Sequence, residues 1–210
     1  MTSTDRPNYF MYFQGSSPAH YRWSSGMASV LGFSPWGGSE IGDADRVGRR
    51  LLDHVGDDER WFQEWTAMGD ELRGIAEREL GSGHDLTAAG AYLRACSYYL
   101  IGERFHTPKD EVGLAAFSKG VDSFRRYAEL TDWPRIECVE VPYEDGSLPA
   151  YLVHADRSEP GSAPCVVYFD GLDITKELQF VRGLKEIVRR GVSALVIDGP
   201  GTGEAIRFRG

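Results

Sequence analysis

The spacing of hydrophobic residues changes near Pro134, and this change constrains the fold more than any other feature of the sequence. From residue 43 to about residue 130, apolar side chains recur at the three- and four-residue steps of amphipathic helices. Beyond Pro134 they alternate or form short continuous runs, as they do in β-strands. The sequence therefore predicts a helical part followed by a part that mixes strands and helices.

Four amphipathic helices are expected before Pro134. Their apolar stripes start at Val47, Trp61, Ala89 and Leu114. Gly81 is a stop signal for the second helix, and Asp85 or Thr87 can cap the third. Each stripe is wide and lies on one side, so the helices should pack on one another or on a neighbouring layer. We predict a helical domain over residues 43–133.

Residues 1–42 differ from this pattern because they are rich in aromatic and small residues and contain Ser-Ser, Ser-Pro and Gly-Gly breaks. We predict an irregular, aromatic-rich segment that packs across another surface of the protein.

The part after Pro134 predicts the beginning of an α/β sheet. Alternating residues from Ile136 to Val153, interrupted by a turn at 143–146, indicate a β-hairpin. A buried strand at 165–169, a helix from about Thr175 to Arg190 and a second buried strand at 192–197 form a βαβ unit, with Gly191 ending the helix. The two strands of such a unit should be parallel.

Charge and composition exclude several classes of protein. The 210 residues contain 23 Lys and Arg against 32 Asp and Glu, a net charge of −9, with no basic run to bind nucleic acid or an anionic membrane surface. No apolar stretch reaches the ~18 residues of a membrane span, and the N-terminus lacks a signal-peptide pattern. We therefore expect a soluble, cytoplasmic protein.

The cysteines and histidines give no sign of a metal site. The three cysteines, Cys96, Cys138 and Cys165, are far apart, which is typical of buried thiols rather than of a disulfide framework. None of the five histidines stands at ligand spacing from another histidine or a cysteine. We predict that the protein has no metal site.

Two turns that follow predicted buried strands are candidate sites. The turn at 169–177 could present backbone N–H groups as an oxyanion hole, or it could be a helix start capped by Asp173 or Thr175, and spacing alone favours the cap. The turn at 199–204 has glycines after a strand, as nucleotide-binding loops do, but Glu204 stands where the third glycine is needed. We favour a tight turn there. The nucleophile motif G-x-S-x-G is absent from the sequence.

The two turns belong to a longer pattern that resembles a known family. A strand ends in Gly-Leu-Asp-Ile-Thr-Lys-Glu (171–177), a helix follows, and the next strand ends in Asp-Gly-Pro-Gly-Thr-Gly-Glu (198–204). This order strongly resembles the third strand, first helix and fourth strand of α/β-hydrolases with an N-terminal helical cap. The group includes 2,6-dihydroxypseudooxynicotine hydrolases, fermentation–respiration switch proteins and polyketide-shortening hydrolases of pigment pathways. The resemblance covers the whole chain, is strongest over 136–208 and is weak before residue 43.

The resemblance implies an α/β fold in which a helical cap domain (43–133) precedes the first part of an α/β-hydrolase sheet (134–210), a hairpin plus a βαβ unit. In that sheet the fourth strand lies between the second and the third. It also implies Ser-His-Asp hydrolysis of a C–C bond next to a ketone, or of an ester bond, in a small aromatic or polyketide-like substrate, without a cofactor. The aromatic-rich segment and the cap would shape an apolar pocket for this small molecule.

Carried over by position, the oxyanion donors of the family fall on backbone N–H groups near Gly171 and Leu172, and the resemblance favours this role over capping alone. The family carries its serine on the fifth strand, with the acid and the histidine beyond it. We therefore expect all three outside this chain, which would be inactive alone. Its partner would be the remainder of the hydrolase fold or a complementary chain, and an apolar third strand would be exposed at the sheet edge.

The alternative is a non-catalytic binding or assembly module. In this case the helical region would dock a partner, and a second chain would complete the sheet. A homo-oligomer is compatible with either interpretation, and a nucleotide-binding protein that uses the 199–204 turn is the third option.

Overall fold

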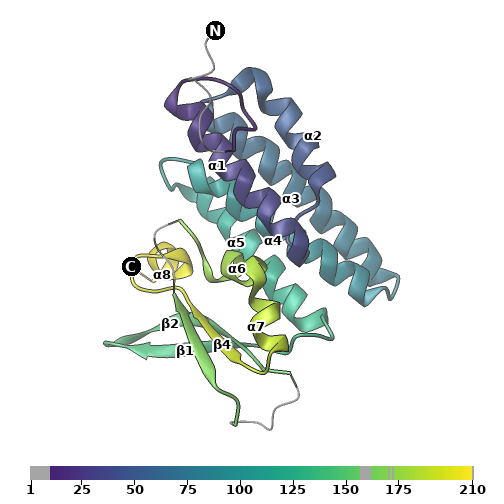
Figure 1. The fold of residues 1–210 in the computed structure, drawn as a ribbon, viewed down its shortest axis with the longest axis vertical. Helices are drawn as coiled ribbons and strands as arrows, with labels where there is room; N and C mark the ends of the chain where they lie inside the picture. Colours follow the sequence, from purple (N-terminus) through teal and green to yellow (C-terminus); the bar gives the residue numbers. More distant parts are fainter. Residues whose placement is uncertain (1–9, 157–161, 170, 172, 210) are drawn as a thin grey trace.

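The computed structural model describes residues 10–156, 162–169, 171 and 173–209, and it consists of a helical layer beside a four-stranded sheet (Figure 1). The helical layer contains α1 (Pro18–Phe33), α2 (Ile41–Leu51), α3 (Asp58–Gly81), α4 (Asp85–Phe105) and α5 (Glu111–Leu130). The strands are β1 (Ile136–Tyr143), β2 (Gly146–Val153), β3 (Cys165–Phe169) and β4 (Ser193–Ile197). Short helical elements complete the described chain: η1 (Ser34–Trp36), η2 (Leu52–His54), α6 (Lys176–Gln179), η3 (Phe180–Leu184), α7 (Lys185–Arg189) and α8 (Gly203–Phe208).

The predicted helices are present, and polar side chains start two of them. The Asp57 carboxylate accepts the Arg60 N–H at the start of α3, and the Asp110 carboxylate accepts the Gly113 N–H at the start of α5. The expected cap of α4 was wrong. Asp85 is its first residue, so His84 occupies the cap position and makes no capping bond through its side chain.

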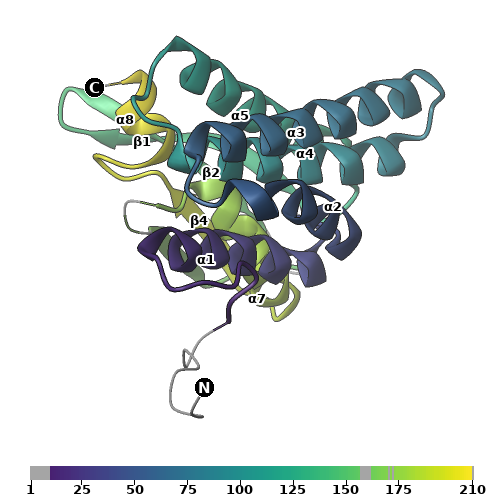
Figure 2. The same cartoon turned by 90° about the horizontal axis from the view of Figure 1, so that it is seen from above.

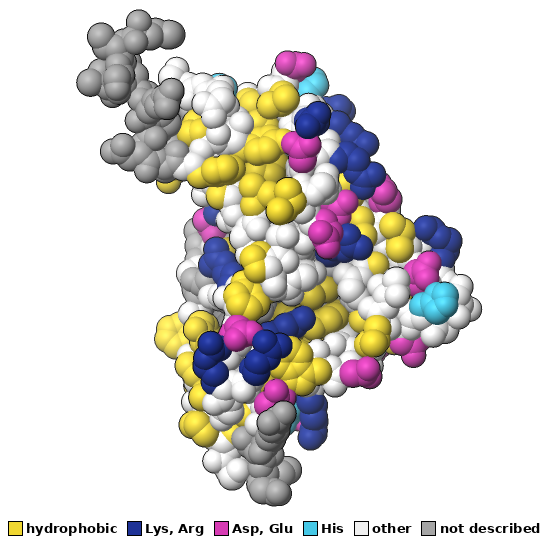
Figure 3. All heavy atoms as spheres, turned by 45° about the vertical axis from the view of Figure 1, so that its right-hand side comes forward, with side chains coloured by type: hydrophobic (Ala, Val, Ile, Leu, Met, Phe, Trp, Pro, Cys, Tyr) yellow, Lys and Arg dark blue, Asp and Glu magenta, His cyan; other side chains and the backbone are white. Residues whose placement is uncertain are grey.

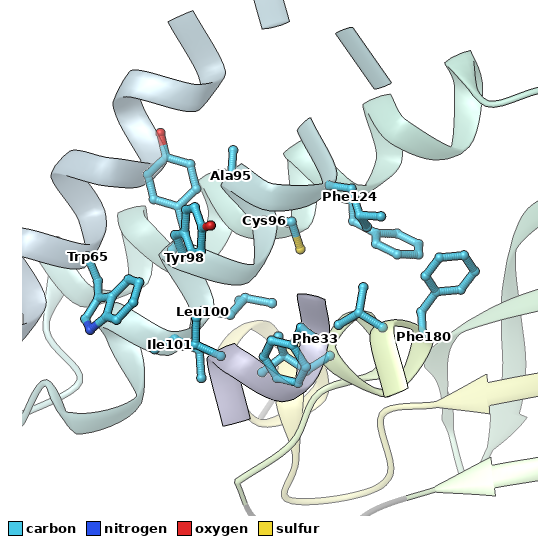
Figure 4. Close-up of a cluster of buried hydrophobic side chains, with 14 of the residues drawn as sticks. Phe33, Trp65, Ala95, Cys96, Tyr98, Leu100, Ile101, Phe124 and Phe180 are labelled. Atoms are coloured by element: carbon cyan, nitrogen blue, oxygen red, sulfur yellow. The ribbon is translucent and has the colours of Figure 1, made fainter. Parts of the chain in front are cut away.

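Helices α3, α4 and α5 lie side by side, with α4 in the middle (Figure 2). Most of α4 is buried, because α3 covers one flank and α5 the other. Figure 4 shows the resulting core, in which side chains of α1, α3, α4, α5 and η3 meet. The ring centre of Phe124 in α5 lies 4.5 Å from that of Tyr151 in β2 and 5.2 Å from that of Phe180 in η3, so α5 packs directly on the sheet and on the segment after β3. One hydrophobic core thus runs through both parts, and the division into domains at 43 and 134 stays a prediction.

The expectation that residues 1–42 are irregular was wrong for Pro18–Phe33, which form α1. Serine and glycine reduce helix propensity, but here they permit close packing. A Cβ atom on Gly26 would lie 2.9 Å from the Trp61 ring, and Ser24 is fully buried, with its hydroxyl oxygen accepting the Phe13 N–H. Tertiary contacts with α3 therefore stabilise a helix that its own composition does not favour.

The sheet has the order β1-β2-β4-β3, so the fourth strand lies between the second and the third as predicted. Strands β1 and β2 form the antiparallel hairpin, β2 and β4 are antiparallel, and β3 and β4 are parallel. This arrangement matches the predicted fold class. The parallel pairing brings the segments that follow β3 and β4 to the same edge of the sheet, beside the helical layer (Figure 1).

The predicted helix between β3 and β4 is interrupted. Its backbone leaves the helical conformation at Val181, Arg182 and Gly183, where Gly183 has φ +95°, and this break separates α6 from α7. The Trp36 ring packs against Gly183, with its nearest atom 3.2 Å from where a Cβ atom would be. The end of α7 follows the prediction, because Arg190 is its C-cap and Gly191, the next residue, adopts φ +83°.

The outer strand β3 is the most exposed part of the sheet. Val167 and Phe169 are 51% and 73% exposed. The expectation of buried thiols holds for Cys96 but was wrong for Cys138 and Cys165, which are exposed because β1 and β3 are the outer strands. All three cysteines are free thiols.

The surface carries mixed charge. Figure 3 shows basic and acidic side chains interspersed over one face, with hydrophobic side chains between them. Among the described residues, no helix has the length and hydrophobicity that crossing a membrane requires.

Candidate functional site

A cavity of about 450 Å³ lies between the helical layer and the turns that follow β3 and β4. We call it the inter-layer pocket. From the helical layer it is lined by Leu100, Glu103, Arg104, Lys109, Leu114 and Phe117. From the sheet side it is lined by Asp173, Thr175, Leu178, Gly201, Ile206 and Arg207. Its position at the carboxyl ends of parallel strands is where ligands bind in open α/β sheets.

The pocket wall is apolar on one part and charged on another. Leu100, Phe117 and Leu178 are buried and supply an apolar surface. Glu103, Arg104, Lys109, Asp173 and Arg207 supply the charges. The pocket was expected to be apolar, but only part of its wall is apolar. No described residue of the segment 1–42 lines the pocket. The aromatic side chains Phe13, Trp23 and Phe33 of that segment lie in the core instead.

Two adjacent residues at the end of α4, Glu103 and Arg104, bind residues that follow different strands of the sheet. The buried Glu103 carboxylate accepts three bonds from the Arg207 guanidinium, at 2.8, 3.0 and 3.1 Å, and lies 2.9 Å from the Lys109 ammonium. The Arg104 guanidinium donates to the Asp173 carboxylate at 3.0 Å. Since Arg207 follows β4 and Asp173 follows β3, α4 is connected to both turns.

The first predicted site, Gly171, lies in the turn after β3, and its carbonyl oxygen accepts a long bond of 3.5 Å from the Ile174 N–H. Leu172, the second predicted donor, lies outside the described residues. The competing interpretation also has support, because the Thr175 hydroxyl oxygen accepts the Leu178 N–H and caps α6. Asp173 does not cap the helix but pairs with Arg104.

The turn after β4 is tight, as expected. The Gly199 carbonyl oxygen accepts bonds from both the N–H and the hydroxyl of Thr202, each at 3.0 Å. A nucleotide-binding loop would direct its N–H groups at a phosphate. Here the Glu204 N–H donates to the Asp198 carboxylate instead, so this part of the turn is already occupied within the protein.

A buried charged group joins the two turns. The Lys176 ammonium lies 2.8 Å from a Glu177 carboxylate oxygen and 2.9 Å from oxygens of both Asp198 and Glu204. We call these four residues the Lys176 cluster. Three of the side chains are at most 1% exposed, and that of Glu204 is 9% exposed. An ammonium group has three N–H donors, and here it donates to Asp198 and Glu204 and forms an ion pair with Glu177.

Asp198 is the centre of this arrangement. One of its carboxylate oxygens accepts the Lys176 backbone N–H, and the other accepts the Glu204 backbone N–H, both at 2.8 Å. Gly203 makes this possible, because a Cβ atom at that position would overlap the Asp198 carboxylate. The starts of α6 and α8 are thereby attached to one side chain at the end of β4.

The surrounding elements add positive charge to the cluster, which itself holds one cation and three carboxylates. Arg125 of α5 donates to Glu204 at 3.0 Å, and Arg209, which binds Glu140 directly, lies 3.8 Å from the Glu204 carboxylate. Burial alone would lower the pKa of Lys176, but the three carboxylates outweigh it and raise that pKa above its ordinary value. Burial raises the pKa of Asp198, whereas the neighbouring Lys176 outweighs burial at Glu177 and lowers the pKa of that carboxyl group.

Sequence reasoning did not identify the Lys176 cluster as a unit. The sequence pattern indicates only that Glu204 disfavours phosphate binding. Lys176, Glu177 and Asp198 are part of the family motifs, but the pattern assigns them no role. A signal was present, because charged residues directly after buried strands must find partners. The sequence could not say that they are one another's partners.

Other chemistry-bearing groups lie elsewhere. The Ser17 hydroxyl is 2.6 Å from His20 Nδ1, but this pair is exposed at the start of α1 and does not line the inter-layer pocket. Within the described part of the chain, no group of three or more His, Cys, Asp or Glu side chains is arranged to hold a metal ion.

Comparison with known proteins shows several relatives named as hydrolases. The chain is 34% identical over 195 residues to hydrolase acrC of Aspergillus aculeatus, which covers 86% of this chain and 45% of that protein. It is 32% identical over 183 residues to 20-hydroxy-prefusarin hydrolase FUS2 of Gibberella moniliformis, covering 85% and 43%. Alpha/beta hydrolase pydG of Acremonium sp is 32% identical over 182 residues, covering 84% and 42%. No family model matches the chain.

Among solved structures, the chain is similar to 2,6-dihydroxy-pseudo-oxynicotine hydrolase, with a TM-score of 0.68 and 24% identity over 85% of this chain and 48% of that one. The predicted resemblance to α/β-hydrolases with a helical cap is thereby confirmed for fold and sequence. The chain spans a little under half the length of the curated relatives it matches.

Proposed function

We propose that this chain, which has the fold of the N-terminal portion of an α/β-hydrolase with a helical cap, forms the cap and the oxyanion side of a serine hydrolase active site. The observation that carries the proposal is the position of the inter-layer pocket. It is enclosed by α4 and α5 on one side and by the turns after β3 and β4 on the other, at the carboxyl ends of the strands.

In this proposal the backbone N–H groups near Gly171 and Leu172 stabilise the oxyanion that forms when a serine attacks the substrate carbonyl carbon. Asp173 and Thr175 support the assignment, because they lie within three residues of Leu172 in the sequence and line the pocket. The serine, the histidine and the orienting acid come from outside residues 1–210, since the sequence contains no G-x-S-x-G motif. The reaction needs no cofactor.

The substrate in this proposal is a small aromatic or polyketide-like molecule, cleaved at a C–C bond next to a ketone or at an ester bond. A volume of about 450 Å³ suits a small organic ligand. The names of two similar proteins, a prefusarin hydrolase and a pseudo-oxynicotine hydrolase, support hydrolysis of such molecules. The charged part of the wall would orient the polar groups of the substrate, while Phe117 and Leu178 would contact its apolar body.

Labelling with a fluorophosphonate tests the location of the nucleophile. The protein that carries this sequence is incubated with the probe, digested and mapped by mass spectrometry, with hydrolysis of p-nitrophenyl butyrate measured in parallel. We expect one adduct on a serine outside residues 1–210. An adduct on a serine within 1–210 contradicts this location, and the absence of both adduct and hydrolysis contradicts the hydrolase function.

A pair of substitutions on α5 tests the pocket. Leu114→Trp places a large side chain into the inter-layer pocket, and Val112→Trp places the same side chain on the exposed face of the helix. We expect Leu114→Trp to raise KM by about 10-fold or more, because a filled pocket excludes substrate, and Val112→Trp to leave KM unchanged. Equal KM values for the two variants would place the substrate elsewhere.

The exposed outer strand favours a second candidate, an assembly module whose sheet a partner chain completes. Val167 and Phe169 present an apolar surface on β3, and exposed apolar edge strands promote pairing with other strands. If this candidate is correct, Val167→Lys abolishes assembly with the partner in size-exclusion chromatography, and the assembled protein neither reacts with the fluorophosphonate nor hydrolyses the ester. Hydrolysis by the assembly would instead support the enzyme.

A further inference from the structure

The Lys176 cluster lies directly behind the wall of the inter-layer pocket. Thr175 and Leu178 line the pocket, and the two residues between them, Lys176 and Glu177, turn into the protein and are buried. Buried charged groups are costly unless each has its partners, so an arrangement of this kind is retained only in a defined geometry.

The bonds of the cluster connect the turn after β3 with the turn after β4. Lys176 belongs to the first, and Asp198 and Glu204 belong to the second. Asp198 accepts backbone N–H groups from both sides, which fixes main chain as well as side chains. The position of one turn is thus defined relative to the other.

Two further elements limit the movement of the cluster. The Tyr151 hydroxyl of β2 donates to Glu177 at 2.8 Å, and the Tyr151 ring centre lies 5.0 Å from the Lys176 ammonium. From the helical layer, Arg125 donates to Glu204. The cluster is therefore attached to β2, to β4 and to α5, while Lys176 itself is five residues after Gly171.

We propose that the Lys176 cluster is a positioning group, which holds the turn after β3 at the place where its backbone N–H groups meet the developing oxyanion. This inference rests on the proposed hydrolase function. Lys176, Glu177, Asp198 and Glu204 do not touch the reacting atoms. They act through the main chain of residues 173–175, which continues directly into Lys176.

Glu204→Gln is the main test variant, because it removes one carboxylate charge from the ammonium and keeps the size of the side chain. Its matched control is Glu64→Gln. Glu64 is also a partly buried carboxylate bound by arginines, Arg60 and Arg50, but it lies on α3 outside the cluster and outside the pocket. Lys176→Met is the second test variant and removes the central cation. Far-UV circular dichroism checks that each variant is folded.

Kinetics of p-nitrophenyl butyrate hydrolysis separate positioning from a merely structural role. An oxyanion contact forms only in the transition state, so Glu204→Gln should lower kcat by about 10-fold and leave KM within about twofold. Affinity for a trifluoromethyl ketone, which forms a tetrahedral oxyanion adduct, should fall by a similar factor. Glu64→Gln should change none of these values. Unchanged kcat and inhibitor affinity in Glu204→Gln, with only a lower Tm, would overturn the proposal.

Hydrogen exchange gives a readout that does not depend on activity. In Glu204→Gln and Lys176→Met, backbone amides of residues 171–178 should exchange faster than in the unmodified protein, whereas Glu64→Gln should leave them unchanged. Identical exchange in all forms would overturn the proposal. If the unmodified protein shows no hydrolysis and no fluorophosphonate adduct, the hydrolase function fails, and exchange alone then decides whether the cluster holds the turn.

Discussion

At the scale of single residues, one arginine–carboxylate pair attaches the segment after α8 to the β1–β2 hairpin. Arg209 binds Glu140 on β1 and the Ser147 carbonyl oxygen on β2, in a partly exposed position. The hydrogen bonds from Arg209 lower the pKa of Glu140 from its ordinary value of 4.5 to about 2. A carboxyl group with a lowered pKa in the folded state stabilises that state while it is ionised.

The pH dependence of stability follows from this shift. The contribution of Glu140 is complete above pH 4.5, its ordinary pKa, and is lost as the pH falls towards 2. Solvent screening of this half-exposed pair limits its value to about 1 kcal/mol or less. Urea denaturation of the unmodified protein and of Glu140→Gln should therefore differ most above pH 5 and coincide near pH 2. A difference that is constant over this range would contradict the assignment.

Two glycines of α3 should respond in opposite ways to the same substitution. A Cβ atom on Gly69 would lie 2.8 Å from the buried Tyr99 ring, which cannot move freely because its hydroxyl donates to Asp70. Gly69→Ala should cost about 1–3 kcal/mol of unfolding free energy. Gly74→Ala meets no atom closer than 3.7 Å and should stabilise the helix by about 0.5–1 kcal/mol. Chemical denaturation of both variants measures the difference, and two shifts of the same sign would contradict the packing.

At the scale of secondary-structure elements, the break between α6 and α7 shows how a tertiary contact overrides a local pattern. The apolar residues from Leu178 to Val188 recur as they would in one continuous helix. Gly183 permits a left-handed backbone conformation, and the Trp36 ring of η1 occupies the space beside it. Leu178, on one side of the break, and Val188, on the other, are both buried.

Gly183→Ala tests the conformation at this break. With φ at +95° and the Trp36 ring 3.2 Å from a new Cβ atom, we expect a loss of about 1–2 kcal/mol. Gly90→Ala, on the exposed side of α4 with no atom within 4 Å, serves as the control and should be neutral or stabilising. Thermal unfolding monitored by circular dichroism compares them. If both variants have the same Tm, the strain at residue 183 is absent.

At the scale of the whole molecule, the helical layer and the sheet are joined by polar contacts as well as by the core. The Glu103 carboxylate of α4 is 2% exposed and binds Arg207 of α8 through several hydrogen bonds. Removing one partner leaves the other charge buried and unpaired, which is strongly destabilising. The effects of substituting the two partners on the unfolding free energy are therefore not additive. The two layers should therefore depend on each other for stability.

A double-mutant cycle measures this dependence. Glu103→Gln, Arg207→Gln and the double variant should give a coupling energy of about 1–3 kcal/mol in urea denaturation. The exposed pair Arg126 and Glu129 on α5 is the control, and its coupling should be below about 0.5 kcal/mol. Equal coupling in the two cycles would show that the contact between the layers contributes no more than a surface ion pair.

Much of the architecture could be predicted because it depends on neighbours in sequence. The helical periods, the glycine stop at 81, the hairpin and the order of the strands all follow from local patterns or from the family resemblance. The helix α1 was missed because its Ser and Gly residues indicate a break unless the contact between Gly26 and Trp61 is known. The exposure of Cys138 and Cys165 was missed because burial depends on which strands lie at the edges of the sheet.

By itself, the sequence determined the type and order of the elements and the resemblance to hydrolases with a helical cap. Only the tertiary structure decided what the charged residues of the two motifs do. Lys176 and Glu204 are 28 positions apart, and no periodicity relates them. They meet because β3 and β4 pair in parallel and bring both turns to one edge of the sheet. Once they are buried there, the cost of removing charges from water makes each of them the required partner of the others.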